Sequence, residues 1–449
     1  MNLGGWDTMT AAAIPLVNQG LVQSTGDHPR AFSFTEGAVT VAGEFGPWRI
    51  IDGGSMQLLH MAFPIVSGTL TGLGSAPVSL AGLEIILEVA LRLLPNEAND
   101  RVDLTFTTVR MTESTGPAIQ PLKLVDPSDR FPFIGDHLVM AALGHALNAN
   151  LDGFSHILAT LQTRGSTDGW LETPFVDWAN VRLGDGRHYL AIFGATRKPN
   201  ERMRLDKVDP ALFSGDGSAF FAASKAIFYQ KLLAPHLQNN FRPRTRFAAN
   251  HSGVSAARFR IPFEAAAAPR AEGVFDFLKP VVNPVRKIFR PKPPKAVPAT
   301  PAASMIRDLT VERMRFACVD GMLKSKVHAV ALLSAARLMV EVDLEMPFRH
   351  DAASGKISFD KDPDPETRHW TEPRKDVDVI TQSLGFVVTT VVIALAKDHV
   401  SAMVKGITSN MQSFNNPART PVRWTGIRDF QASHAVLDDC FWFRDDRPV

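Results

Sequence analysis

Cysteine and tyrosine are scarce in this chain, which contains two of each among 449 residues. Cys318 and Cys440 are too few for a disulfide framework, and their spacing fits neither a zinc site nor a CxxC redox pair. We therefore expect two reduced thiols packed in the interior. Phenylalanine occurs 29 times, and its ring needs no hydrogen-bond partner when buried. A phenylalanine-rich core and an unusually apolar internal cavity would both account for this bias.

The chain also lacks an excess of charge, because 48 basic and 46 acidic residues leave a formal net charge of +2. This balance gives no broad basic field and argues against nucleic acid as a partner. Residues 1–22 contain no lysine or arginine before their apolar part, and Asp7 interrupts them, so they do not resemble a Sec signal peptide. We expect a cytoplasmic protein, although non-classical export would leave no mark in the sequence.

One uncharged stretch, residues 379–396, reaches the lower length limit for crossing a bilayer. Its polar residues Thr381, Gln382, Thr389 and Thr390 and its β-branched character argue against insertion. We expect a buried helix here.

Catalytic and metal-binding signatures are missing as well. No nucleophile elbow, P-loop, GxGxxG turn or HExxH pair occurs. His137 and His145 share an expected helix but lie eight residues, or about 12 Å, apart, too far for one metal ion. The acidic residues of 351–378 alternate with basic residues and prolines, which is typical of a solvated loop. We therefore expect no enzyme, no metal and no cofactor.

The clearest structural pattern lies in residues 42–73, where Gly53 and Gly54 supply the positive φ angles of a hairpin turn. The strand after the turn alternates strictly and presents Leu59, Met61, Phe63 and Ile65 to one face. Period-two patterns over 32–94 and 102–111 predict an antiparallel sheet. Within it, residues 83–94 fit a strand and a short helix about equally, and the context favours a strand.

Helical periodicity appears over 136–151, and a longer helix running on to residue 161 is also compatible with the pattern. Two short strands, 178–183 and 188–194, follow around a turn at 184–186, and a second amphipathic helix is expected over 219–237. This order of strands and helices predicts an α+β fold and not a Rossmann arrangement.

A proline-rich basic segment divides the chain into an N-terminal module (1–265), a linker (266–303) and a C-terminal part (304–449). The last part repeats the order of the first, with strands around 310–318 and 327–346, a long helix over 377–411 and a final strand pair within 421–444. The linker interleaves apolar and basic side chains. It is therefore either a plain connector or a segment that contacts a membrane interface peripherally. The residues concerned are Phe275, Phe277, Lys279, Arg286, Lys287, Phe289 and Arg290.

Several segments resemble one known family. They are GWD (5–7) with VN (17–18), GPWRIIDGGS (46–55), FPIVSG (63–68), LNANLDGFSHILATL (147–161), DGWLETPFVDWA (168–179) and SAFFAASKAIFYQKLLAPHL (218–237). Together they resemble the clostridial forty-seven-kilodalton TULIP-type proteins, which are encoded beside OrfX genes in botulinum neurotoxin clusters. The resemblance covers residues 1 to about 237, and the basic linker has no counterpart in it.

The resemblance implies a TULIP-like fold, in which long curved antiparallel sheets wrap around long helices, with two modules in an elongated chain. It implies a non-enzymatic protein that binds a lipid or other apolar ligand in a groove between sheet and helix. The alternative is a toxin-accessory or assembly component with packed modules that binds a partner protein encoded nearby. The groove residues that it suggests are Met61, Phe63, Ile65, Leu138, Leu143, Leu147 and Phe154.

Overall fold

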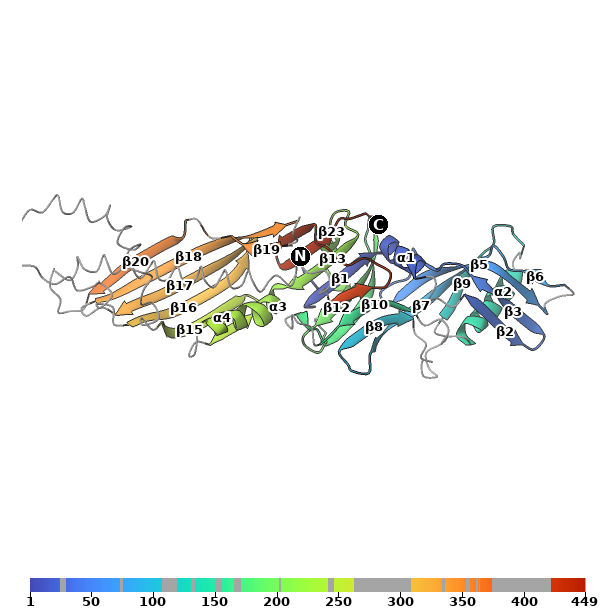
Figure 1. The fold of residues 1–449 in the computed structure, drawn as a ribbon, viewed down its shortest axis with the longest axis horizontal. Coiled ribbons are helices and arrows are strands. Elements are labelled where there is room, and N and C mark those ends of the chain that lie inside the picture. The colour runs from blue at the N-terminus through green and yellow to red at the C-terminus, as the bar shows by residue number, and fades with distance from the viewer. Residues whose placement is uncertain are drawn as a thin grey trace, which may run out of the picture. The chain divides into compact units, whose positions relative to one another are not determined.

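The computed structural model describes residues 1–24, 30–72, 76–106, 119–130, 134–149, 156–164, 171–201, 203–240, 246–261, 308–332, 336–352, 356–360, 362, 364–373 and 421–448. These residues are mostly β-structure with a few short helices, so the expected α+β balance shifts toward β (Figure 1). The linker, its membrane-interface candidates and the ranges 377–411 and 379–396 lie outside the described residues. Within the described part, no helix combines the length and hydrophobicity needed to cross a bilayer.

Two compact units make up the chain, and each draws on distant segments. The first consists of Met1–Lys231, His350–Ser358 and Met411–Val449, and the second of Leu232–Arg349 and Phe359–Asn410. The boundaries of these two units therefore differ from the sequential ranges 1–265, 266–303 and 304–449 that the sequence suggests.

The first unit contains a six-stranded antiparallel sheet that joins both ends of the sequence. Its last strand in the sequence, Cys440–Asp445, pairs with Ala219–Ser224 in a register that sets Trp442 opposite Ala222. The expected hairpin around 184–186 is confirmed, because Phe175–Arg182 pairs with His188–Ala195. In spatial order the strands are β11 (Phe175–Arg182), β12 (His188–Ala195), β1 (Thr8–Ala13), β13 (Ala219–Ser224), β23 (Cys440–Asp445) and β22 (His434–Leu437).

A second, ten-stranded sheet of the same unit confirms the antiparallel pattern expected over 32–94, including a strand at 83–94. Its main path runs through β2 (Ala31–Glu36), β3 (Val39–Phe45), β5 (Leu58–Thr71), β7 (Glu84–Pro95), β8 (Arg101–Phe106), β10 (Ile157–Gln162) and β21 (Val422–Trp424). Three further strands flank it: β4 (Arg49–Ile51), β6 (Val78–Ser79) and β9 (Ile119–Val125).

The glycine turn between β4 and β5 forms as the sequence predicts. Gly53 and Gly54 have φ angles of 127° and 73°. A Cβ atom on Gly54 would lie 2.3 Å from the carbonyl oxygen of Leu58, so only glycine fits there. Asn180 on β11 donates its side-chain amide to the carbonyl oxygens of Gly53 (3.1 Å) and Leu58 (3.0 Å). The turn is therefore fastened to the six-stranded sheet.

Two helices lie in the first unit beside these sheets, α1 (Ile14–Gln23) and α2 (Ile134–Ala149). The helix expected over 136–151 is confirmed, but its extension to residue 161 is wrong, because residues from Ile157 onward form β10. Asn150, Asp152 and Gly153 intervene in the sequence, and all three are weak helix formers. Residues 157–162 instead form the backbone hydrogen bonds of a strand that pairs with β8 and β21.

The helix expected over 219–237 is wrong in its first part, where β13 forms. Phe220 and Phe221 point to opposite faces of the sheet and are both buried, as in a central strand covered on both sides. Ser224 then caps a helical run, since its hydroxyl accepts from the Ile227 amide at 3.2 Å. That run consists of α3 (Lys225–Ile227), a π-helical turn (Phe228–Leu233) and α4 (Ala234–Asn240).

The second unit is built on a seven-stranded antiparallel sheet. It confirms a strand at 310–318, and the range 327–346 covers parts of two strands. The sheet runs β14 (Phe247–Asn250), β15 (Gly253–Ile261), β16 (Asp308–Val319), β17 (Met322–Leu332), β18 (Ala336–Asp351) and β19 (Lys356–Phe359), with β20 (Glu366–Pro373) also paired to β18.

The solvated loop expected over 351–378 is wrong at β19 and β20. Its alternating charges are those of a strand with an exposed face, where Arg368 lies opposite Glu341 on β18. The opposite face of this sheet is buried and apolar. Its members include Met314, Phe316, Leu323, Val327, Leu338, Val340, Val342 and Met346.

Both cysteines are free and buried, which confirms the expected packed thiols. Cys318 belongs to β16 and Cys440 to β23. Burial raises the pKa of the Cys440 thiol to about 12, so this side chain stays protonated and unreactive at neutral pH.

Candidate functional site

The structure brings together five of the seven residues suggested for an apolar groove. Met61, Phe63 and Ile65 occupy successive inward positions of β5, and Leu143 and Leu147 lie one helical turn apart on α2. All five belong to one core cluster of the first unit, and each is at most 3% exposed.

Leu138 lies apart from this cluster, with 45% of its surface exposed. Five residues separate it from Leu143, which places the two about 140° apart around the helix axis. Val139, four residues before Leu143, is the inward residue of that turn and is 1% exposed. Phe154 lies outside the described residues.

Three contacts hold α2 close to the sheet. A Cβ atom on Gly144 would lie 2.6 Å from the Pro121 ring, so glycine permits the close approach to β9. Asn148 donates to the carbonyl oxygen of Ile119 at 2.9 Å and accepts from the Ile119 amide at 3.3 Å. The His145 ring stacks on Phe34 of β2, with 5.9 Å between the ring centroids.

Burial to this degree means that the five residues meet other protein atoms on all sides. A groove open to an acyl chain would leave the side chains along it accessible to a water-sized probe, whereas Met61, Leu143 and Leu147 are 0% exposed. In the described conformation these side chains form a packed core.

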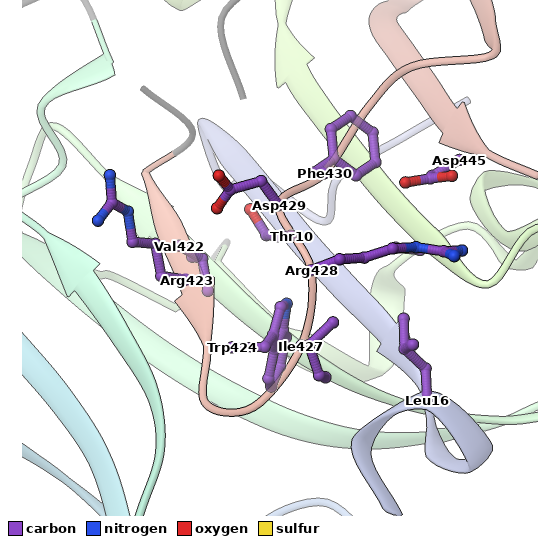
Figure 2. Close-up of a pocket in the computed structure, with 11 residues that line it drawn as sticks. Thr10, Leu16, Val422, Arg423, Trp424, Ile427, Arg428, Asp429, Phe430 and Asp445 are labelled. Carbon is purple, nitrogen blue, oxygen red and sulfur yellow. The ribbon is translucent and has the colours of Figure 1, made fainter. Parts of the chain in front are cut away.

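A small pocket of the first unit lies elsewhere, between β21, the loop after it, β1 and α1 (Figure 2). Val422, Trp424 and Ile427 line it together with Thr10 and Leu16. Its volume of about 30 Å³ suits roughly one water molecule, so it is too small for an acyl chain.

Asp445 borders this pocket, and its role is to stabilise the end of strand β23. Burial acts to raise the pKa of its carboxyl group, but hydrogen bonds from Arg447 and from the Gln431 amide outweigh burial and hold the pKa below its ordinary value. The Arg447 Nε atom lies 2.9 Å from Asp445 Oδ1. This carboxylate is therefore fully committed to local partners.

A larger pocket of about 540 Å³ lies on the charged face of the second unit's sheet. Strands β15 to β18 all contribute to it, and sequence reasoning missed it because its residues come from four separate stretches. Only the strand register brings them together, for example Arg313 opposite His328 and His328 opposite Glu341. The lining residues are Arg258, Thr310, Glu312, Arg313, His328, Val330, Arg337, Met339 and Glu341.

Within the described ranges, no group of three or more histidine, cysteine, aspartate or glutamate residues could hold a metal ion. His137 and His145 are both exposed on α2.

Known proteins resemble this chain in sequence and in fold. The family model described as OrfX-like, Protein OrfX2/OrfX3/P47, matches residues 3–268. Protein OrfX3 of Paraclostridium bifermentans is 22% identical over an alignment of 274 residues, and the match covers 54% of this chain and 55% of that protein. The match thus spans about half the length of this curated relative.

Two solved structures are similar over nearly their whole length. P47 from Clostridium botulinum A2 has a TM-score of 0.72 at 16% identity and covers 100% of this chain and 98% of its own. P47 of Clostridium botulinum E1 has a TM-score of 0.68 at 15% identity, with 98% and 99% covered. At such identities the likeness establishes the fold alone. Together with the family match it confirms the resemblance seen in the sequence, and this chain belongs to the OrfX-like family of OrfX2, OrfX3 and P47 proteins.

Proposed function

We propose that this protein is a non-enzymatic scaffold of TULIP type, which fills its interior with its own side chains and binds a partner protein through its surface. The observation that carries this proposal is the complete burial of Met61, Leu143 and Leu147 between α2 and the sheet. A filled interior gives a rigid framework and leaves recognition to surface side chains. The partner implied by the family resemblance is a toxin-cluster component encoded nearby.

Polar groups in the first unit support a structural role. The Asp7 carboxylate accepts hydrogen bonds from the Thr196 amide at 2.8 Å, from the Thr196 hydroxyl at 2.7 Å and from the Ser224 hydroxyl at 3.3 Å. It thereby joins β1 to the end of β12 and to β13. A group with its acceptors so occupied is poorly placed for acid–base chemistry.

Binding of a lipid or other apolar ligand is the second candidate, and one observation favours it. The cluster between α2 and β5 is lined by aliphatic and aromatic side chains, and Asn148 fastens α2 near its C-terminal end. Lifting the N-terminal half of α2 would admit an acyl chain, whose burial yields about 0.8 kcal/mol per methylene. In this candidate the groove exists only when the ligand is bound.

Native mass spectrometry of the purified protein separates the two candidates. A scaffold with a filled interior gives a clean apo mass and takes up neither added fatty acid nor added phospholipid. Acyl lipid that co-purifies in near-stoichiometric amount, identified after organic extraction, would overturn the scaffold and establish the second candidate.

A further inference from the structure

The pocket of the second unit has an apolar floor formed by one row of side chains across the sheet. Thr310 on β16 lies opposite Val330 on β17, and Val330 lies opposite Met339 on β18. Trp370 on β20 lies opposite Met339 and continues the row. Its ring stacks on His328 at 5.9 Å and is 41% exposed, which is unusual for so large an apolar side chain.

Charged residues flank this floor on both sides along the strands. Arg313 belongs to the row of His328 and Glu341, two residues before the floor on β17, and Arg337 lies two residues before Met339 on β18. Both arginines are exposed, and neither guanidinium has a hydrogen-bond or ion-pair partner among the described residues. Arg258 is different, since it pairs with Glu312 at 3.4 Å.

Neighbouring charges on the same face are neutralised by one another. Lys324 pairs with Glu345 at 2.8 Å, and Lys326 pairs with Asp343 at 3.3 Å. The unpaired cations Arg313 and Arg337 therefore stand out beside the floor, and they lie diagonally across it.

We propose that this pocket docks an acidic segment of the partner protein, with one apolar side chain on the floor and a carboxylate at each of Arg313 and Arg337. This inference rests on the proposed partner-binding function. Guanidinium groups bind carboxylates in bidentate fashion, and an apolar floor between two of them selects an apolar anchor between two acids. Glu341 in the same lining disfavours a polyanion such as a phosphate cluster, and its carboxylate suits the amide donors of a peptide backbone.

The strand geometry also predicts the spacing of the segment. Successive rows on the same face of a strand are two residues, or about 6.8 Å, apart, and an extended peptide repeats its side chains at the same distance. A segment that lies along the strands would therefore carry an acid, an apolar residue and a second acid at alternate positions.

The test uses the full chain and a capped peptide with the order aspartate-serine-leucine-serine-aspartate, titrated while tryptophan fluorescence or heat is recorded. We expect saturable binding that weakens severalfold when salt rises from about 50 to 300 mM. A peptide with asparagine in place of both aspartates should bind about tenfold more weakly, because the charge-assisted pairs are lost.

Matched variants locate the site. Arg313→Gln combined with Arg337→Gln should weaken binding about tenfold or more, whereas Arg315→Gln, an exposed arginine of the same strand outside the lining, should leave it nearly unchanged. Circular dichroism confirms that each variant is folded. Equal binding of the asparagine peptide, equal binding by the double variant, or full competition by inorganic phosphate at equal concentration would overturn the proposal.

These outcomes can be told apart from those of the lipid experiment. If the protein gives a clean apo mass but does not bind the peptide, the docking pocket is wrong and the filled scaffold still stands. If lipid co-purifies and the peptide binds specifically, the filled scaffold is wrong and the docking pocket still stands.

Discussion

His188 illustrates how one half-buried side chain makes the stability of the fold depend on pH. Its Nε2 atom donates a hydrogen bond to the Asn180 side-chain oxygen, in the group that fastens the β4–β5 turn. Burial is the main cause that lowers its pKa below 6.5, and Arg182 adds to this, while Asp52 acts in the opposite direction. The folded protein thus keeps this ring neutral where the unfolded chain takes up a proton.

Stability should therefore decrease as the medium is acidified. The contribution of neutral His188 is complete above the unfolded pKa of 6.5 and is lost as the pH falls from there toward the lower folded pKa. Urea unfolding at several pH values should show a smaller decrease for His188→Gln than for the wild type. The exposed His137→Gln serves as the control, and parallel curves for His188→Gln and the wild type would contradict the prediction.

Asp445 provides a second prediction at this scale. It is 2% exposed, and Arg447 and the Gln431 amide both donate to it. We expect Asp445→Asn to lower the free energy of unfolding by about 1.5–3 kcal/mol, the usual value of hydrogen bonds to a charged group. The exposed neighbour Asp446→Asn should change it by less than about 1 kcal/mol. Chemical denaturation of both variants measures the difference.

At the scale of the element, α2 offers a direct test of its packing. If Leu143 lined an open groove, Leu143→Trp would place the new ring in the groove and leave the fold intact. Because Leu143 is 0% exposed, we expect overpacking that costs about 1–3 kcal/mol of unfolding free energy.

Leu138→Trp is the matched control on the same helix, since Leu138 is 45% exposed and has room for a larger ring. The two variants should therefore differ clearly in thermal and chemical unfolding. If Leu143→Trp proves as stable as Leu138→Trp, the interior holds unfilled space, and the apolar-ligand candidate gains support.

Asn148 carries a further prediction about the same element. It exchanges two hydrogen bonds with the backbone of Ile119 and also donates to the Gly144 carbonyl oxygen at 2.8 Å. Asn148→Ala should lower the unfolding free energy by about 1–3 kcal/mol, because buried backbone groups lose their partner. Under the scaffold proposal the variant still takes up no lipid, and lipid uptake by it alone would show that α2 gates a groove.

Turns and strands that are encoded by neighbouring residues could be predicted from the sequence. Gly53 and Gly54, the strand at 83–94 and the turn at 184–186 depend on turn chemistry and on period-two alternation, both of which can be read along the chain. The segment 219–237 was misassigned because a short buried run is compatible with a strand and a helix alike, and only pairing with β1 and β23 decides between them.

The candidate sites were less accessible to prediction. The cluster around Met61 and Leu143 could be outlined because each side follows one periodic pattern. The charged pocket could not, since Arg258, Arg313 and Arg337 become neighbours only through the register of four strands, and register is a long-range property.

At the scale of the whole molecule, the six-stranded sheet depends on β22 and β23. Deletion of residues 434–448 would remove Trp442, whose indole donates to the Leu212 carbonyl oxygen at 2.6 Å, and would leave β13 as an open edge. We expect the truncated protein to lose the cooperative unfolding of its first unit and to aggregate. Calorimetry and light scattering measure this, and a variant that lacks only residues 448–449 should behave as the wild type.

The pairing of β13 with β23 also determines when the six-stranded sheet can be completed during protein synthesis. Ser224 and Cys440, which face each other in the finished sheet, are separated by 216 residues, so a ribosome needs roughly 10–40 s to deliver the second after the first. During that interval the edge of β13 that later pairs with β23 has no strand beside it. Completion of this sheet therefore waits for the synthesis of β23, and until then the chain presents an unpaired strand edge of the kind that chaperones shield.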